Sequence, residues 1–152
     1  MAYDSGQARV DLLDEVGDAT DHLAEALAAL GEAFEALDDY NAERLEEQLF
    51  RPVQMAYGRA RRTHSEFAGR HGLPNRSFVP APPGHPSQGV KGFIDAAVSG
   101  VVRADARISQ LQDSMRPVEV GDAELRAGLS EVRRMIADVP AHARAFVRVL
   151  GR

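Results

Sequence analysis

The chain of 152 residues contains no cysteine. It therefore has no disulfides, no thiolate ligand for a metal, no cysteine nucleophile and no covalent attachment point for haem. Long apolar runs are also missing, since stretches such as Leu27–Leu30 are far shorter than the roughly 20 residues that cross a bilayer. The first residues show neither the basic nor the apolar region of an export signal. From these absences we expect a soluble, cytoplasmic protein without a membrane contact.

Motifs of known chemistry are absent as well. The sequence has no glycine-rich phosphate loop, nucleophile elbow or catalytic triad, and it lacks the Glu-x-x-His pattern of di-iron bundles. His22 and Glu25 have the spacing of one helical turn, but their acidic neighbours indicate a surface carboxylate cluster. His64 and His71 lie about 10.5 Å apart along a helix, too far for bonds of about 2.1 Å to one ion. We expect no metal, no cofactor and no catalytic residue, and the sequence leans away from an enzyme.

The charged residues are unevenly distributed along the chain. The net charge is −5, but residues 1–43 hold twelve acidic side chains and one base, Arg9, a net charge of −11. Residues 44–152 carry a net charge of +6. Because opposite charges attract, we expect the acidic and basic parts to pair within one bundle. A basic stretch comprises Arg59, Arg61, Arg62, Arg70 and Arg76. An anionic partner is conceivable there, although the few aromatic residues and the negative net charge argue against nucleic acid.

Apolar residues recur at steps of three and four in several segments. The most regular stripe consists of Leu13, Val16, Thr20, Leu23, Leu27, Leu30, Phe34 and Leu37. This spacing returns side chains to one face of a helix that packs along other helices. We predict an all-α, antiparallel four-helix bundle that forms one domain of 152 residues. The predicted helices cover residues 8–37, 41–72, 88–115 and 122–150, and a proline-rich loop covers residues 73–86.

Local features modify these helices. In the second helix, successive apolar steps of four coincide with Pro52, which predicts a kink at residues 50–53. Pro140 should bend the fourth helix without ending it, because the apolar periodicity resumes beyond the proline. Asp122 is placed to cap the start of that helix. Small residues flank the first stripe, namely Gly17, Ala24 and Gly31 on one side and Ala19, Ala26 and Ala33 on the other. We expect neighbouring backbones to approach the first helix closely.

The loop at residues 73–86 leaves the directions of the helices open. It contains five prolines, which favour an extended chain, and it is longer than the roughly two to eight residues that usually join antiparallel neighbours. If the loop only turns, the helices alternate up, down, up, down. If it travels the length of the bundle, the third helix runs parallel to the second, as in ferritin-like bundles. The sequence is compatible with both topologies.

Polar side chains enter the predicted core around one histidine. The short connection between the first two helices makes them antiparallel, which puts Thr20 level with His64. Tyr57 and His71 occupy the same heptad position as His64, seven residues away on either side. One interpretation is a polar pocket that binds a small ligand with these four residues. The other is a structural histidine bonded to Thr20 or Asp21, with Tyr57 and His71 reaching solvent.

The third predicted helix has an outer face with little charge. The positions opposite its core stripe are Gly92, Ala96, Ser99, Val102, Arg103, Ala106 and Ser109. Exposed helix faces are usually richer in charge, so we expect a cover: residues 78–79 of the loop, a second copy of the chain or another protein. The leading hypothesis is a non-enzymatic protein that acts through protein–protein contacts at this face, by self-association or within an assembly. The alternative hypothesis is a bundle that binds a small ligand or cofactor, with or without catalysis, at Thr20, Tyr57, His64 and His71.

Overall fold

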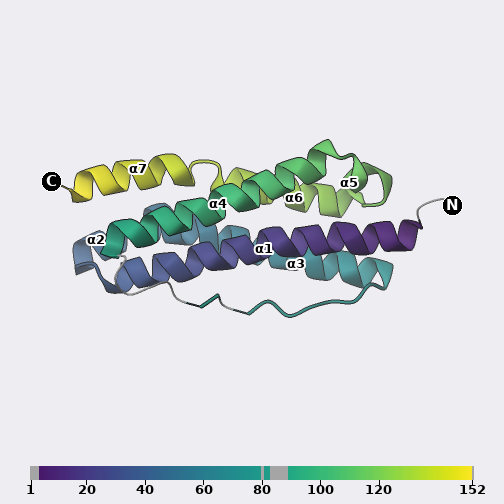
Figure 1. Ribbon diagram of the computed structural model, residues 1–152, viewed down its shortest axis with the longest axis horizontal. Helices are drawn as coiled ribbons and strands as arrows, with labels where there is room; N and C mark the ends of the chain where they lie inside the picture. The colour runs from purple at the N-terminus through teal and green to yellow at the C-terminus, as the bar shows by residue number, and fades with distance from the viewer. Residues whose placement is uncertain (1–3, 80, 83–88, 152) are drawn as a thin grey trace.

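The computed structural model describes residues 4–79, 81–82 and 89–151, and within these ranges the regular structure is entirely helical. The longer helices are α1 (Ser5–Glu35), α3 (Arg51–His71), α4 (Gly89–Asp113), α6 (Ala123–Ile136) and α7 (Val139–Leu150). The shorter ones are α2 (Asp39–Leu45), the π-helix η1 (Glu46–Phe50) and α5 (Arg116–Glu119). Figure 1 shows a bundle of four rods, in which α2, η1 and α3 continue one another and α6 is followed by α7. The predicted all-α bundle is confirmed.

Helix α4 packs antiparallel on α1. A Cβ atom on Gly100 of α4 would meet Ala26 of α1, whereas Arg107, two turns later, lies 3.9 Å from Asp18. Residues later in α4 thus contact residues earlier in α1, so the two helices run in opposite directions.

None of the helices in the described part of the chain combines the length and apolar composition that a membrane crossing requires.

Helix α6 packs antiparallel on α3 in the same manner. Arg59 of α3 contacts Glu131 at 3.0 Å, and Arg70 contacts Asp122 at 2.7 Å. Since α3 runs antiparallel to α1, helices α3 and α4 point in the same direction (Figure 1). The helices therefore run up, down, down, up, which is the crossover topology of the two that the sequence left open.

The described part of the connection between α3 and α4 travels along α1. Arg76 contacts Asp21 at 3.0 Å, and Ala81 lines a pocket with Ala28 and Gly31 of the same helix. Later residues of the connection thus meet later residues of α1, along the lower edge of the bundle in Figure 1. Residues 80 and 83–86 of the predicted loop lie outside the described residues.

The acidic helix α1 forms ion pairs with bases from other segments of the bundle. Its ion pairs are Glu15 with Arg116, Asp18 with Arg107 and Asp21 with Arg76, at 2.8, 3.9 and 3.0 Å. The basic partners come from three different segments, so the predicted pairing of acidic and basic parts within one bundle is confirmed.

The backbones of α1 and α4 approach each other closely at Gly100. Ala19, Ala26 and Ala33, which flank the first stripe, are buried. Opposite them, a Cβ atom on Gly100 would lie 2.7 Å from the carbonyl oxygen of His22. The predicted close packing of α1 is therefore confirmed, and it depends on small residues on both helices.

Two helix irregularities differ in form from the prediction. Next to the kink predicted at residues 50–53, the structure has a π-helical turn, η1 (Glu46–Phe50), which ends two residues before Pro52. A π-turn admits one extra residue, which accounts for the additional apolar steps of four. The fourth predicted helix is interrupted rather than bent: α6 ends at Ile136 and α7 begins at Val139. Pro140 in the first turn of α7 lacks an N–H group and its ring would crowd the carbonyl of residue 136 in a continuous helix.

Helix ends follow their capping residues. The side chain of Asp122 accepts a hydrogen bond of 2.8 Å from the N–H of Leu125, so the predicted cap is confirmed. Gly72 ends α3 with a left-handed φ of 63°, which glycine adopts without steric cost. The third helix is shorter than predicted, because α4 ends at Asp113 and Met115 is 51% exposed with φ of 67°.

Candidate functional site

His64 is the most deeply buried titratable side chain of α3, with 2% exposure. The edge of its ring meets Phe78, with ring centroids 5.0 Å apart and planes at 89°. Its Nδ1 atom has no hydrogen-bond partner among the described residues. The partner that the sequence suggested is engaged elsewhere, because Thr20 donates its hydroxyl to the Val16 carbonyl, 2.8 Å away on its own helix. Thr20 and His64 are both buried, but no hydrogen bond joins them.

The environment of His64 favours the neutral imidazole. Burial is the largest cause that lowers its pKa below the ordinary value, and the positive charge of Arg76 lowers the pKa further. A hydrogen bond that the His64 ring donates to Asn75, together with the carboxylates of Asp14 and Asp21, raises the pKa but does not outweigh these effects. The side chain therefore stays uncharged around neutral pH.

This burial predicts a pH dependence of stability. Because the pKa is about 6.5 in the unfolded chain and lower in the folded one, the unfolded state binds more protons between the two values. The contribution is fully present above about pH 6.5 and is lost as the pH falls through the folded-state pKa. Urea unfolding at about pH 7.5 and about pH 5 should therefore give a smaller free energy of unfolding at the acid pH. His64→Leu should remove part of that decrease.

The exposed His142 on α7 supplies the control. His142→Leu should keep the pH dependence of the parent protein, because His142 is not buried. An unchanged pH dependence in His64→Leu would show that His64 is not the buried neutral histidine described above.

Arg76 anchors the segment after α3, which carries Phe78, next to His64. The guanidinium of Arg76 donates to Asp21 at 3.0 Å and lies 4.5 Å from the centroid of the Phe78 ring. It also rests on Gly17, where a Cβ atom would overlap it. These contacts hold Phe78 against the ring of His64. The prediction that residues 78–79 cover the outer face of the third helix is therefore wrong for Phe78, which packs on α3.

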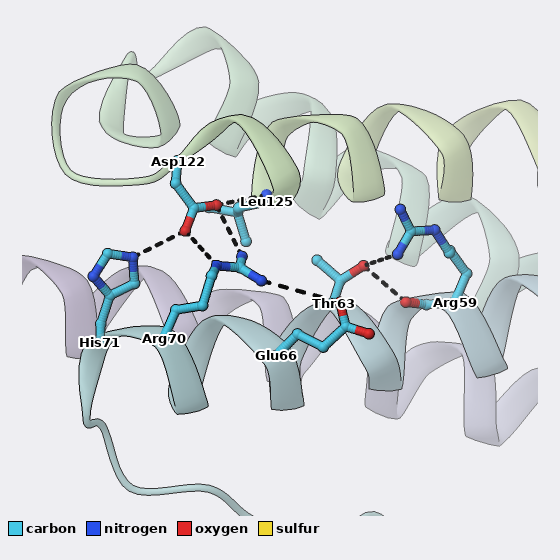
Figure 2. A network of polar contacts seen from close by, with 7 residues as sticks. All are labelled: Arg59, Thr63, Glu66, Arg70, His71, Asp122 and Leu125. Atoms are coloured by element: carbon cyan, nitrogen blue, oxygen red, sulfur yellow. Dashed lines mark hydrogen bonds and ion pairs between the residues drawn. The ribbon is translucent and has the colours of Figure 1, made fainter.

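His71 belongs to a separate polar network at the end of α3 (Figure 2). Asp122 accepts hydrogen bonds from Nε and Nη2 of Arg70, at 2.7 and 2.9 Å, and lies 2.9 Å from Nε2 of His71. Burial alone would raise the pKa of Asp122, but the hydrogen bonds from Arg70, Leu125 and His71 hold it far below the ordinary value. The His71 ring packs against the Phe67 ring, with centroids 4.5 Å apart and planes tilted by 50°. This network joins α3 to the start of α6.

Tyr57 lies at a third place. Its ring is half-buried, lies 5.2 Å from the guanidinium carbon of Arg61 and lines a pocket of about 360 Å³ with Leu27 and Ala28 of α1. The four residues predicted to share a ligand pocket are thus distributed among a buried core position, a helix-joining network and a surface pocket. The structure does not gather them in one cavity.

The predicted outer face of α4 is open to solvent in the described residues. Ala96, Val102, Arg103 and Ala106 are exposed, and Gly92, Ser99 and Ser109 are half-buried. Val102 is 50% exposed, which is unusual for a branched apolar side chain in the middle of a long helix. We call these seven residues together with Asp95 the α4 face. Asp95 is also exposed and lies within the same arc of the helix, although the sequence prediction had omitted it.

Two shallow hollows border the α4 face where α4 meets α6 and α7. One, of about 470 Å³, is lined by Val98 of α4 and Val147 of α7. The other, of about 260 Å³, includes Val102 and the Pro140 ring. Both lie where the fourth rod is interrupted, so apolar surface continues from the α4 face toward α7.

His22, another histidine considered in the sequence, contacts only a neighbour on its own helix among the described residues. His22 and Glu25 lie 3.4 Å apart on α1, in agreement with a surface pair. Among the described residues, no group of three or more His, Asp or Glu side chains is arranged to hold a metal ion.

Comparisons with models of protein families, with curated proteins and with solved structures find no significant match for this chain.

Proposed function

We propose that this protein is a non-enzymatic bundle that acts through protein–protein contact, and that the α4 face is the contact between two copies of the chain. The observation that carries the proposal is the exposed, weakly charged surface in the middle of a 25-residue helix. In the described residues nothing covers this surface. Water-exposed helices normally carry dense charge on that side.

The small residues of the α4 face suit a helix partner. Gly92, Ala96, Ser99, Arg103 and Ala106 follow one another at steps of four, three, four and three, which is the spacing of a seam between packed helices. Four of the five have short side chains, so a second helix can approach at the lower end of the usual interaxial range of about 8–10 Å.

The two charges of the α4 face favour a second copy of α4 as the partner. Asp95 and Arg103 have no ion pair within the described part of the chain, and they lie four residues before and four residues after Ser99. If two α4 helices cross antiparallel with Ser99 on the two-fold axis, Asp95 of each copy faces Arg103 of the other. Such self-complementary contacts are the usual basis of a two-fold dimer. The same register sets Ala96 opposite Val102, a small residue against a large one.

A mass measurement tests the dimer. Size-exclusion chromatography with light scattering at micromolar concentration should give twice the chain mass of 16.5 kDa. Val102→Glu and Ala106→Glu should each give a monomer, because an unpaired carboxylate in a close helix seam is costly. Ala127→Glu, at an exposed position of α6, is the matched control and should leave the dimer intact. A parent protein of 16.5 kDa at these concentrations would exclude self-association.

Charge reversal tests the register. Asp95→Arg and Arg103→Asp should each weaken the dimer by at least tenfold in dissociation constant, because each places like charges opposite one another twice. The double variant should restore most of the affinity. A dimer that both single variants leave unchanged would place the contact elsewhere, even if the protein is dimeric.

A further inference from the structure

A large hollow is lined by residues of α3, by residues 75–78 and by Met135 of α6. Its volume is about 970 Å³. Four arginines line it, namely Arg59, Arg61, Arg62 and Arg76. None of the described residues that line this hollow carries a carboxylate, although the chain as a whole has a net charge of −5. We call it the arginine hollow.

Two of the four guanidinium groups are balanced by carboxylates and two are not. Arg59 pairs with Glu131 at 3.0 Å, and Arg76 pairs with Asp21 at 3.0 Å. Within the described residues Arg61 and Arg62 have no ion pair, and Arg61 lies over the ring of Tyr57. Both side chains are exposed. The arginine hollow therefore carries about two unbalanced positive charges.

The other lining residues combine neutral donors with apolar surface. The hydroxyl groups of Ser65 and Ser77 and the amide of Asn75 line the hollow, and Asn75 donates to Ser65 at 3.4 Å. Met55, which is 55% exposed, and Phe78 supply apolar surface. Sites for organic ligands commonly combine apolar surface with a few converging polar groups, in volumes of about 300–1,000 Å³.

We propose that the arginine hollow binds a small phosphorylated organic molecule. A phosphate monoester carries a charge of about −1.5 to −2 at neutral pH, which matches the two unbalanced guanidinium groups. The planar fork of arginine donates two parallel hydrogen bonds to phosphate oxygens. The organic part of the ligand rests against Met55 and Phe78. This inference does not depend on the α4 face, because none of the lining residues belongs to α4.

The site is coupled to the buried histidine through Phe78 and Arg76. Phe78 lines the hollow with one part of its ring while its neighbour beneath is His64. The charge of Arg76 lowers the pKa of His64, so a phosphate bound beside Arg76 should raise that pKa again. His64 thus reports binding without being a ligand of the phosphate.

The experiment is an NMR and calorimetric titration with phenyl phosphate as the probe. We expect saturable binding of one phenyl phosphate per chain, with shifts of the Arg61, Arg62 and Phe78 resonances and a higher pKa of His64. Inorganic phosphate should bind the same residues at least threefold more weakly, because it lacks the apolar part. Phenol should not bind, because it lacks the charge.

Matched variants separate a site from general attraction of anions. Arg61→Gln with Arg62→Gln should weaken phenyl phosphate at least tenfold, whereas Arg144→Gln with Arg148→Gln, which removes the same charge from the exposed surface of α7, should change affinity less than twofold. Equal losses in both double variants, or no saturation, would overturn the proposal. A twelve-nucleotide single strand that binds while phenyl phosphate does not would also overturn it, in favour of a nucleic-acid partner. The oligomeric state of each variant is measured in parallel. A loss of phenyl phosphate binding can then be told apart from a loss of the α4 dimer.

Discussion

Replacing Gly100 by alanine is expected to lower the free energy of unfolding by about 1 kcal/mol. The added Cβ atom would lie 2.7 Å from the His22 carbonyl oxygen and 3.2 Å from the backbone nitrogen of Ala26. These are backbone atoms of α1, so they cannot rotate away, and overpacking of this kind costs about 1–3 kcal/mol. The loss exceeds the gain of about 1 kcal/mol that alanine brings to a helix interior. Thermal and urea unfolding, followed by circular dichroism, measure the difference.

Gly58 is the matched control for Gly100. It lies in the interior of α3, and a Cβ atom there would meet nothing within 4 Å. Gly58→Ala should therefore raise the free energy of unfolding by about 0.5–1 kcal/mol, through the helix preference of alanine alone. The two variants make the same chemical change, but the expected changes in the free energy of unfolding have opposite signs. Stabilisation by Gly100→Ala would mean that α1 and α4 are not in the close contact described here.

Replacing Asp122 by alanine should cost about 2–3 kcal/mol. The loss of an N-cap accounts for about 1 kcal/mol. The variant also removes the acceptor for Arg70 and His71, whose hydrogen bonds join α3 to α6 (Figure 2). Asp138 is the control, since it occupies the N-cap position of α7 but its side chain makes no capping hydrogen bond. Asp138→Ala should cost less than about 0.5 kcal/mol.

The cost of Asp122→Ala should also depend on pH. The pKa of Asp122 is lowered in the folded protein, so its contribution is complete above the unfolded value of about 3.9 and declines as the pH falls toward the folded-state pKa. The difference between the parent protein and the variant should therefore shrink below about pH 4. A difference that stays constant down to about pH 2.5 would contradict a role for the ionised carboxylate.

The sequence predicted the helices well because their determinants are local. Apolar spacing placed the four rods, and Asp122 was recognised as a cap from its position alone. The direction of α4 could not be predicted in this way, because residues 73–86 are long enough either to turn or to cross. The antiparallel packing of α4 on α1, seen at Gly100 with Ala26 and at Arg107 with Asp18, decides between the two.

The site residues were harder to predict because their contacts are not periodic. The register placed Thr20 opposite His64, but a threonine hydroxyl can equally bond the carbonyl four residues earlier on its own helix, and here it does. The partners of His71 and His64, namely Asp122 and Phe78, lie 51 and 14 residues away along the chain, and no helical repeat relates them. The arginine hollow likewise combines α3 with residues 75–78 of the loop and with Met135 of α6. The α4 face, by contrast, is contained in one helix and was visible in the spacing of its small residues.

The crossover connection affects when the helices can pack during synthesis on the ribosome. Helix α1 makes its most extensive contacts with α4, and more than fifty residues separate the end of the first from the start of the second. At a synthesis rate of about 5–20 residues per second, several seconds pass between the synthesis of α1 and that of α4, which packs on its alanine face. In an up-down bundle each helix packs on the next one made, whereas here the contact of α1 with α4 forms only after α2, η1 and α3 have been made. Folding therefore depends on contacts of high sequence separation, which form more slowly than the local pairing of other helical bundles.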